Sequence, residues 1–299
     1  MKHSYSITAI ILGVFFLSQL LGLVIINNYI DHDLLSATGR VSFKALPLGL
    51  EAPETSGAES FLTIALSILI GTGLALLLIK FRLGSVWKIW FLLAVFISLH
   101  VAFSSFVSNT IAGVAALVFS LWKIFKPNVF VHNFTEMFVY GGLAAIFVNM
   151  LDLFAVILLL LFISAYDVYA VWKSKHMVKL AKFQTDSKLF AGIMIPYKLP
   201  PMKADKKMKG KKIMIKTAIL GGGDVAFPLL FTGVVFKGLL LMNPVSLAFA
   251  KILILPICAT AALGWLLVEA EKDKFYPAMP PISFGCFVGY IIMKLLGFL

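Results

Sequence analysis

Residues 153–172 read LFAVILLLLFISAYDVYAVW. About 20 apolar residues in an α-helix cross the ~30 Å hydrocarbon core of a bilayer, so this segment predicts a transmembrane helix. Its one charged side chain, Asp167, is costly inside a membrane and therefore points to a functional role. The segment decides the fold because eight similar runs flank it.

The apolar runs predict nine transmembrane helices. They cover residues 7–26, 61–79, 86–107, 111–125, 134–150, 153–172, 213–241, 245–268 and 279–299. The runs are continuous and lack the alternation of a transmembrane β-barrel, so the predicted fold is all-α and polytopic. We expect one membrane-embedded domain over residues 1–299, with spans in 1–172, a basic loop at 173–212 and further spans in 213–299.

The composition excludes an ordinary soluble protein. Hydrophobic residues make up 61% of the 299 residues, charged residues 13%, and the mean hydropathy is +0.98. The formal charge of +12 does not indicate a nucleic-acid partner, because thirteen Lys residues gather between Lys173 and Lys216 in one loop. A cytoplasmic loop beside anionic lipid explains them better, so the expected partner is the bilayer.

The distribution of Lys and Arg predicts the orientation of the chain. With nine spans, one side carries 21 of these residues and the other side carries two, Arg40 and Lys44. Positively charged residues concentrate in cytoplasmic loops. We therefore expect a multi-pass protein of the cell membrane with its N-terminus in the cytoplasm and its C-terminus outside.

Two connections are longer than simple turns. The outer one covers roughly residues 31–60, and the inner one is the basic loop. Within the inner loop, residues 189–197 form an apolar patch too short to span, which we expect to lie at the interface or to pack over the protein.

Two acidic residues are predicted to lie deep in the membrane. Glu136 and Asp152 lie near ends of predicted spans, where we expect water to reach them, whereas Asp167 and Asp224 lie further in. At ~1.5 Å per helical residue, Asp167 lies roughly 9 Å from Lys173 and Asp224 roughly 12 Å from Lys216. Their helices run in opposite directions, so the two carboxyl groups are expected to face each other.

Two carboxyl groups in a poorly hydrated site cannot both ionise easily, so they share one proton. In aspartic proteases the ionised acid activates a water while the protonated one donates to the scissile carbonyl oxygen. This chemistry needs no cofactor and no metal. The two cysteines, Cys258 and Cys286, lie in apolar runs and give neither a disulfide framework nor a metal motif.

Two weaker motifs accompany these acids. Three glycines, Gly221, Gly222 and Gly223, precede Asp224; they allow a close approach of helices or of a substrate backbone, and a packing notch is an equally good explanation. Residues 276–281 read YPAMPP, which predicts an extended, kinked segment at the cytoplasmic mouth of the last span, although an ordinary helix start explains the prolines as well.

Together these residues resemble the presenilin and signal peptide peptidase family of intramembrane aspartyl proteases. The family's YD motif corresponds to Tyr166 and Asp167, and its GxGD motif to Gly221, Gly223 and Asp224. Its PAL motif corresponds to Pro277 and Ala278, with Met279 in place of Leu. The resemblance covers the whole chain, and the lack of a large soluble domain suggests a compact prokaryotic or archaeal homologue.

The resemblance implies hydrolysis of peptide bonds in or near single transmembrane helices of membrane proteins. Asp167 and Asp224 would be catalytic, and the Pro277 segment would engage the substrate. A cytoplasmic N-terminus is similar to the presenilin branch and favours substrates whose own N-termini point outward. Nothing in the chain demands partner subunits, and homo-oligomerisation is left open.

A substrate helix must unwind before cleavage, because its carbonyl groups are already hydrogen-bonded. The apolar residues Ile213, Met214 and Ile215 lead into the seventh span, and we expect the unwound substrate to pair with them as an added strand, opposite the Pro277 segment.

The main alternative is a proton- or cation-coupled transporter that uses the same intramembrane acids. Against it, the chain shows no pair of broken spans repeated in two halves, and its acids gather toward one membrane face.

Overall fold

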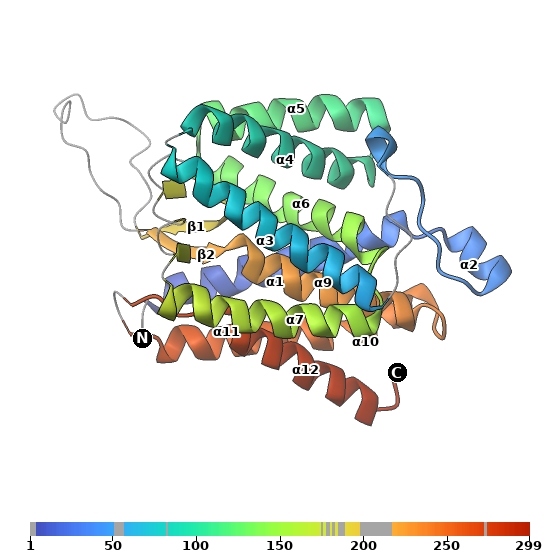
Figure 1. The fold of residues 1–299 in the computed structure, drawn as a ribbon. Coiled ribbons are helices and arrows are strands. Elements are labelled where there is room, and N and C mark those ends of the chain that lie inside the picture. Colours follow the sequence, from blue (N-terminus) through green and yellow to red (C-terminus); the bar gives the residue numbers. More distant parts are fainter. Residues whose placement is uncertain are drawn as a thin grey trace.

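The computed structural model describes residues 4–50, 57–81, 83–174, 176–177, 180, 183–184, 189–197, 217–271 and 274–299. Within them the chain forms a helical bundle with one small β-hairpin (Figure 1). The α-helices are α1 (Tyr5–Tyr29), α2 (His32–Thr38), α3 (Ala58–Lys80), α4 (Gly84–Ser104), α5 (Asn109–Phe125), α6 (Val129–Val148), α7 (Leu153–Val168), α9 (Gly222–Leu239), α10 (Val245–Ile252), α11 (Ile254–Glu269) and α12 (Met279–Leu295). A 3₁₀ turn η1 (Pro47–Gly49), a π-helical turn η2 (Tyr169–Lys173) and the strands β1 (Gly192–Pro196) and β2 (Thr217–Gly221) complete the fold.

Seven helical segments of the described chain are long and apolar enough to cross a membrane. Two further apolar helices, Asn109–Phe125 and Met279–Leu295, are shorter. Each of them overlaps one of the nine predicted runs, and the eighth run contains both α10 and α11. The prediction of a helical, multi-pass membrane protein is confirmed at this level.

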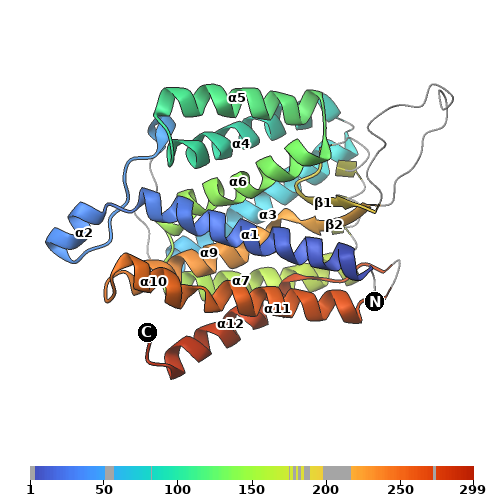
Figure 2. The ribbon, with the colours of Figure 1, turned by 180° about the vertical axis from the view of Figure 1, so that it is seen from behind.

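Helix α9 lies at the centre of the bundle. It packs against α1, α6, α7, α10, α11 and α12, and 61% of its 18 residues are buried, the largest share among the seven candidate spans. Helices α4 and α5 form one side of the bundle, and α7, α11 and α12 form the other (Figures 1 and 2). A helix surrounded by protein on all sides is a rigid support for a side chain at its start.

The two ends of the chain lie at opposite ends of the bundle. The N-terminus lies at the end that carries the hairpin, whereas the C-terminus lies at the end that carries α2, in both views (Figures 1 and 2). The hairpin, the start of α9 and the end of α7 therefore share one end of the molecule.

The hairpin bears out one sequence prediction and corrects another. Residues 189–197 pack over the protein, which was one of their two expected placements, and within them Gly192–Pro196 form β1, paired antiparallel with β2 from Gly192 opposite Gly221 to Pro196 opposite Thr217. The seventh run was expected to be helical from residue 213, whereas its residues 217–221 are β2 and the helix begins at Gly222. A short apolar run rich in β-branched residues is equally compatible with a buried strand, so periodicity could not decide.

Helix α6 holds the outer edge of β1. The side-chain amide of Asn133 donates to the Met194 carbonyl at 2.8 Å and its Oδ1 accepts from the Met194 amide at 2.9 Å. His132 Nε2 lies 2.7 Å from the Gly192 carbonyl oxygen. The edge of β1 that faces away from β2 is thereby occupied by side chains of α6.

Candidate active site

Asp167 lies in the last turn of α7. The helix begins at Leu153 after the N-cap residue Asp152, whose side chain accepts from the Ala155 amide at 2.7 Å, and continues through apolar residues into the π-helical turn η2. Asp167 is buried, with 9% of its surface exposed. Its Oδ2 accepts a hydrogen bond from the backbone amide of Met279 at 3.1 Å. A buried carboxyl group in the membrane therefore has a fixed backbone donor.

The donor comes from the predicted Pro-Ala-Met segment. Pro277, Ala278 and Met279 are all buried, and Met279 is the first residue of α12. One turn further on, Ser164 of α7 donates to Ser283 of α12 at 2.8 Å, which fixes the two helices beside the Asp167 contact. Since Met279 acts through its amide, the replacement of the family's Leu by Met leaves this contact unchanged.

The extended part of this segment is shorter than predicted. An extended, kinked segment was expected through Pro281, but only residues up to Ala278 are outside the helix. Pro280 and Pro281 lie in the first turn of α12, where the missing amide hydrogen costs nothing because the first helical amides lack intrahelical acceptors. The ordinary helix start is correct for these two residues.

Asp224 lies in the first turn of α9. Gly221 is the N-cap residue and Asp224 is the third residue of the helix, so its carboxyl group folds back and interacts with the Gly221 amide. A Cβ atom on Gly221 would lie 3.0 Å from Asp224 Oδ2, which shows how closely the carboxyl group approaches this glycine. This is the reciprocal half of a capping box.

The other two glycines serve different contacts. The Gly222 amide donates to the Ala191 carbonyl at 3.2 Å, and a Cβ atom on Gly222 would lie 3.2 Å from Cε1 of Tyr140. Gly223 is exposed, and a Cβ atom there would lie 3.3 Å from Cε2 of Phe227. Because Gly222 has no side chain, β1 and α6 can both lie close to the start of α9.

The structure brings the two acids together. Helices α7 and α9 pack against each other, and the carboxyl group of Asp167 lies close enough to act electrostatically on that of Asp224. The two side chains come from the end of one helix and the start of the next, after the hairpin has returned the chain to the same end of the bundle (Figure 1). The depth estimate for Asp224, which assumed a helix from Lys216, was wrong in its premise because α9 begins at Gly222.

Tyr166 points to the segment that follows α7. Its hydroxyl lies 2.8 Å from Nε2 of His176, and Nδ1 of His176 lies 2.5 Å from the Ser174 hydroxyl. Burial lowers the pKa of His176 below its ordinary value. The tyrosine of the predicted motif therefore anchors the first residues after the helix to α7.

The predicted strand-addition residues Ile213, Met214 and Ile215 lie outside the described residues. The strand β2 begins two residues later, at Thr217. The Gly222 amide donates to the Ala191 carbonyl, and hydrogen-bonded residues alternate along an antiparallel ladder. The backbone amides and carbonyls of Leu220 and Ala218 therefore point toward β1, whereas those of Ile219 point to the opposite edge of β2. The Ile219 side chain is 41% exposed.

Glu136 is one charged group whose surroundings differ from the sequence prediction. Glu136 was expected to be reached by water, but it is 1% exposed and pairs with Lys123 of α5. The predicted run began at residue 134 and the helix begins at Val129, so Glu136 lies in its second turn. Tyr140 follows one turn later, and an acid, an aromatic hydroxyl and a lysine in adjacent apolar runs were the signal that could have revealed this cluster.

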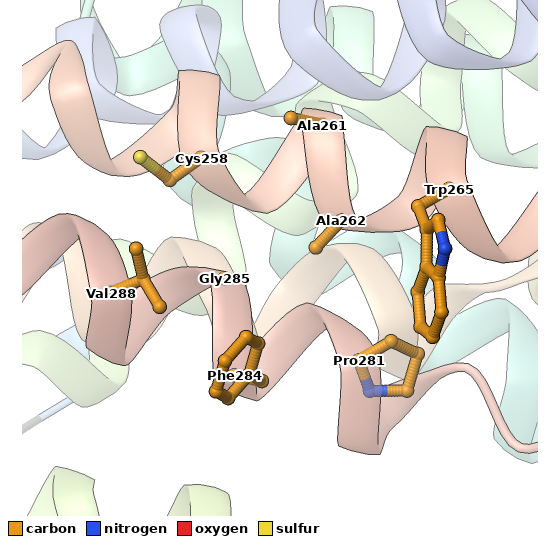
Figure 3. Close-up of a pocket in the computed structure, with 8 residues that line it drawn as sticks. All are labelled: Cys258, Ala261, Ala262, Trp265, Pro281, Phe284, Gly285 and Val288. Carbon is orange, nitrogen blue, oxygen red and sulfur yellow. The ribbon is translucent and has the colours of Figure 1, made fainter.

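A cavity of about 360 Å³ lies elsewhere, between α11 and α12 (Figure 3). It is lined by Cys258, Ala261, Ala262, Trp265, Pro281, Phe284, Gly285 and Val288. None of the lining residues is acidic, and neither Asp167 nor Asp224 reaches it. The paired acids are therefore the chemically distinctive site.

The fold and the paired acids define a multi-pass helical membrane protein with two carboxyl groups on neighbouring helices. Residues 51–298 match the family described as signal-peptide peptidase, presenilin aspartyl protease. The chain belongs to this family.

Solved structures agree with the fold. A presenilin family intramembrane aspartate protease, solved in space group C222, matches with a TM-score of 0.61 and 16% identity over 97% of this chain and 99% of that one. A second structure of a presenilin family intramembrane aspartate protease, solved in space group P2, matches with a TM-score of 0.57 and 17% identity over 96% of each chain. A search of curated protein sequences gave no match.

Proposed function

We propose that this protein is an intramembrane aspartyl protease that hydrolyses peptide bonds within or near transmembrane helices of other membrane proteins. The observation that carries the proposal is the meeting of Asp167 and Asp224 at one end of two packed helices, with Asp167 held by the Met279 amide. Membership of the family supports the same chemistry, whereas nothing in the fold or the comparisons supports the transporter alternative.

The two acids would act on one water. The ionised carboxylate takes a proton from the water as its oxygen attacks the scissile carbonyl carbon, and the protonated carboxyl group gives its proton to the carbonyl oxygen. The resulting diol collapses as the carbon–nitrogen bond breaks: the acid that took the proton from water gives it to the nitrogen, and the other carboxylate takes a proton from a diol hydroxyl. The two acids exchange roles through this cycle, and neither forms a covalent bond with the substrate.

The substrate would be presented as a strand along β2. The second edge of β2 runs through Ile219 to Gly221, three residues before Asp224, so a peptide paired there would lie beside the acids. The location differs from the expected residues 213–215 only by a few positions along the chain. Main-chain pairing at a strand edge binds many side-chain sequences, which suits a protease of membrane helices.

We further propose nine membrane crossings, with the hairpin end of the bundle in the cytoplasm. The proposal combines the nine apolar segments with the excess of Lys and Arg in the loops at that end. The two acids would then lie near the cytoplasmic face, where water can reach them.

The test is cleavage of a transmembrane peptide by the purified protein in lipid. Asp167→Asn and Asp224→Asn should each abolish cleavage, because each removes one member of the proton-sharing pair. Asp152→Asn is the matched control: Asp152 caps the far end of the helix that carries Asp167, and an Asn side chain can still accept from the Ala155 amide, so that only the bond from the Gly57 amide is lost. Cleavage that survives loss of either Asp167 or Asp224 would contradict the proposal.

A further inference from the structure

One face of α6 carries polar side chains at successive turns. His132, Glu136 and Tyr140 follow one another at four-residue intervals, so they form a stripe along one side of the helix. His132 contacts the hairpin at Gly192 and Glu136 pairs with Lys123, while Tyr140 packs against Gly222. The stripe leads from the buried ion pair to the start of α9.

Tyr140 is enclosed at the start of α9. It is 2% exposed and is the largest of the fully buried side chains among the described residues. Its ring lies against Gly222, where a Cβ atom would come within 3.2 Å of Cε1. Because position 222 has no side chain, the tyrosine ring can pack against α9 only two residues before Asp224.

The hydroxyl of Tyr140 has unused hydrogen-bonding capacity. Its oxygen is inaccessible to solvent and makes no hydrogen bond with another described residue, an arrangement that is unfavourable in a folded protein. Two acids act on this hydroxyl, and the influence of Glu136 is larger than that of Asp224. In contrast, the buried hydroxyl of Tyr29 donates to the Val101 carbonyl at 2.7 Å.

The ion pair determines which acid is available to the hydroxyl. Lys123 donates to Oε1 of Glu136, and both side chains are 2% exposed, so the charge of Glu136 is already matched within the protein. Asp224 is partly exposed and lacks a lysine or arginine partner among the described residues. Although Glu136 acts on the hydroxyl more strongly, its charge is already balanced by Lys123, so Asp224 is the acid that gains a partner from this donor.

We propose that Tyr140 is a positioning residue for Asp224: its hydroxyl donates a hydrogen bond to the Asp224 carboxyl group when a peptide occupies the site. This proposal rests on the proposed proteolytic function. The bond satisfies the buried hydroxyl at the moment when the carboxyl group must hold the attacking water. It therefore contributes to the reaction step and not to binding of the substrate.

The experiment compares Tyr140→Phe with Tyr29→Phe in the intact protein, reconstituted in lipid with a transmembrane peptide substrate. Both changes remove one buried hydroxyl and keep the ring. We expect Tyr140→Phe to lower kcat at least tenfold while KM stays within twofold, because only the orientation of Asp224 is lost. Tyr29→Phe loses a hydrogen bond far from the acids and should leave both constants unchanged.

The outcomes separate the two proposals. If the unaltered chain does not cleave, or Asp224→Asn cleaves, the proteolytic function fails and the role of Tyr140 fails with it. If the unaltered chain cleaves and Tyr140→Phe matches it, the role of Tyr140 alone is wrong. A Tyr140→Phe protein that loses helical content, or that raises KM at constant kcat, also overturns the role, since the hydroxyl would then serve folding or binding.

Discussion

The buried pair of Lys123 and Glu136 gives a quantitative prediction about stability. The two side chains are each 2% exposed, so Lys123→Met leaves the Glu136 carboxylate buried without a counter-charge. Breaking a buried ion pair by removing one partner costs about 3–5 kcal/mol, whereas replacing both partners by hydrophobic residues of similar volume is often neutral or stabilising. We expect Lys123→Met to lose roughly 3 kcal/mol of unfolding free energy and Lys123→Met/Glu136→Met to lose less than about 1 kcal/mol.

The assay is unfolding in mixed micelles with increasing denaturing detergent, followed by the helical circular dichroism signal. The exposed pair of Glu271 and Lys274, whose side chains are 63% and 62% exposed, supplies the control, because Glu271→Gln should produce no measurable change. A Lys123→Met protein as stable as the original would refute the reasoning. A double variant less stable than either single variant would do the same, since it would show that the two groups stabilise the fold independently.

Two further predictions concern the strand and the orientation. Ile219→Pro removes an amide from the edge of β2 that faces away from β1 and should abolish cleavage with the helical content intact. Ile219→Ala keeps the amide and should retain most activity. Equal activity of the two variants would exclude strand addition at this edge. For the orientation, a membrane-impermeant thiol reagent applied from outside the cell should label Ser36→Cys on α2 and leave Ser4→Cys unlabelled, with the unaltered chain as background; the reverse pattern would invert the proposed topology.

The helical part of the fold could be predicted because the bilayer restricts the choices. A segment that crosses hydrocarbon must satisfy its backbone groups internally, so long apolar runs such as residues 153–172 become helices. The two acids were conspicuous for the same reason, since an ionisable group in such a run is expensive. Their approach followed from the opposite directions of the two helices, although the depth of Asp224 was estimated from a helix that starts six residues too early.

The hairpin could not be predicted because its evidence is not local. β1 is stable only through its pairing with β2 across the basic loop and through the side chain of Asn133 on α6. Residues 217–221 are short and apolar, a pattern that fits a strand or a buried helical turn equally well. The predicted helix ends were wrong for a similar reason. An error of five residues at the start of α6 was enough to place Glu136 where water was expected to reach it.

The two acids are supported in different ways, and this difference bears on how the site operates. Asp167 is fixed by a backbone amide from α12 and by the adjacent Ser164–Ser283 bond, so its position depends on the packing of α7 against α12. Asp224 depends on Gly221, the residue that ends β2 and caps α9. A peptide that pairs with β2 would therefore act directly on the support of Asp224 and leave that of Asp167 unchanged. By this argument the substrate itself completes the alignment of the pair, and Asp224 is the acid whose orientation should respond to substrate binding.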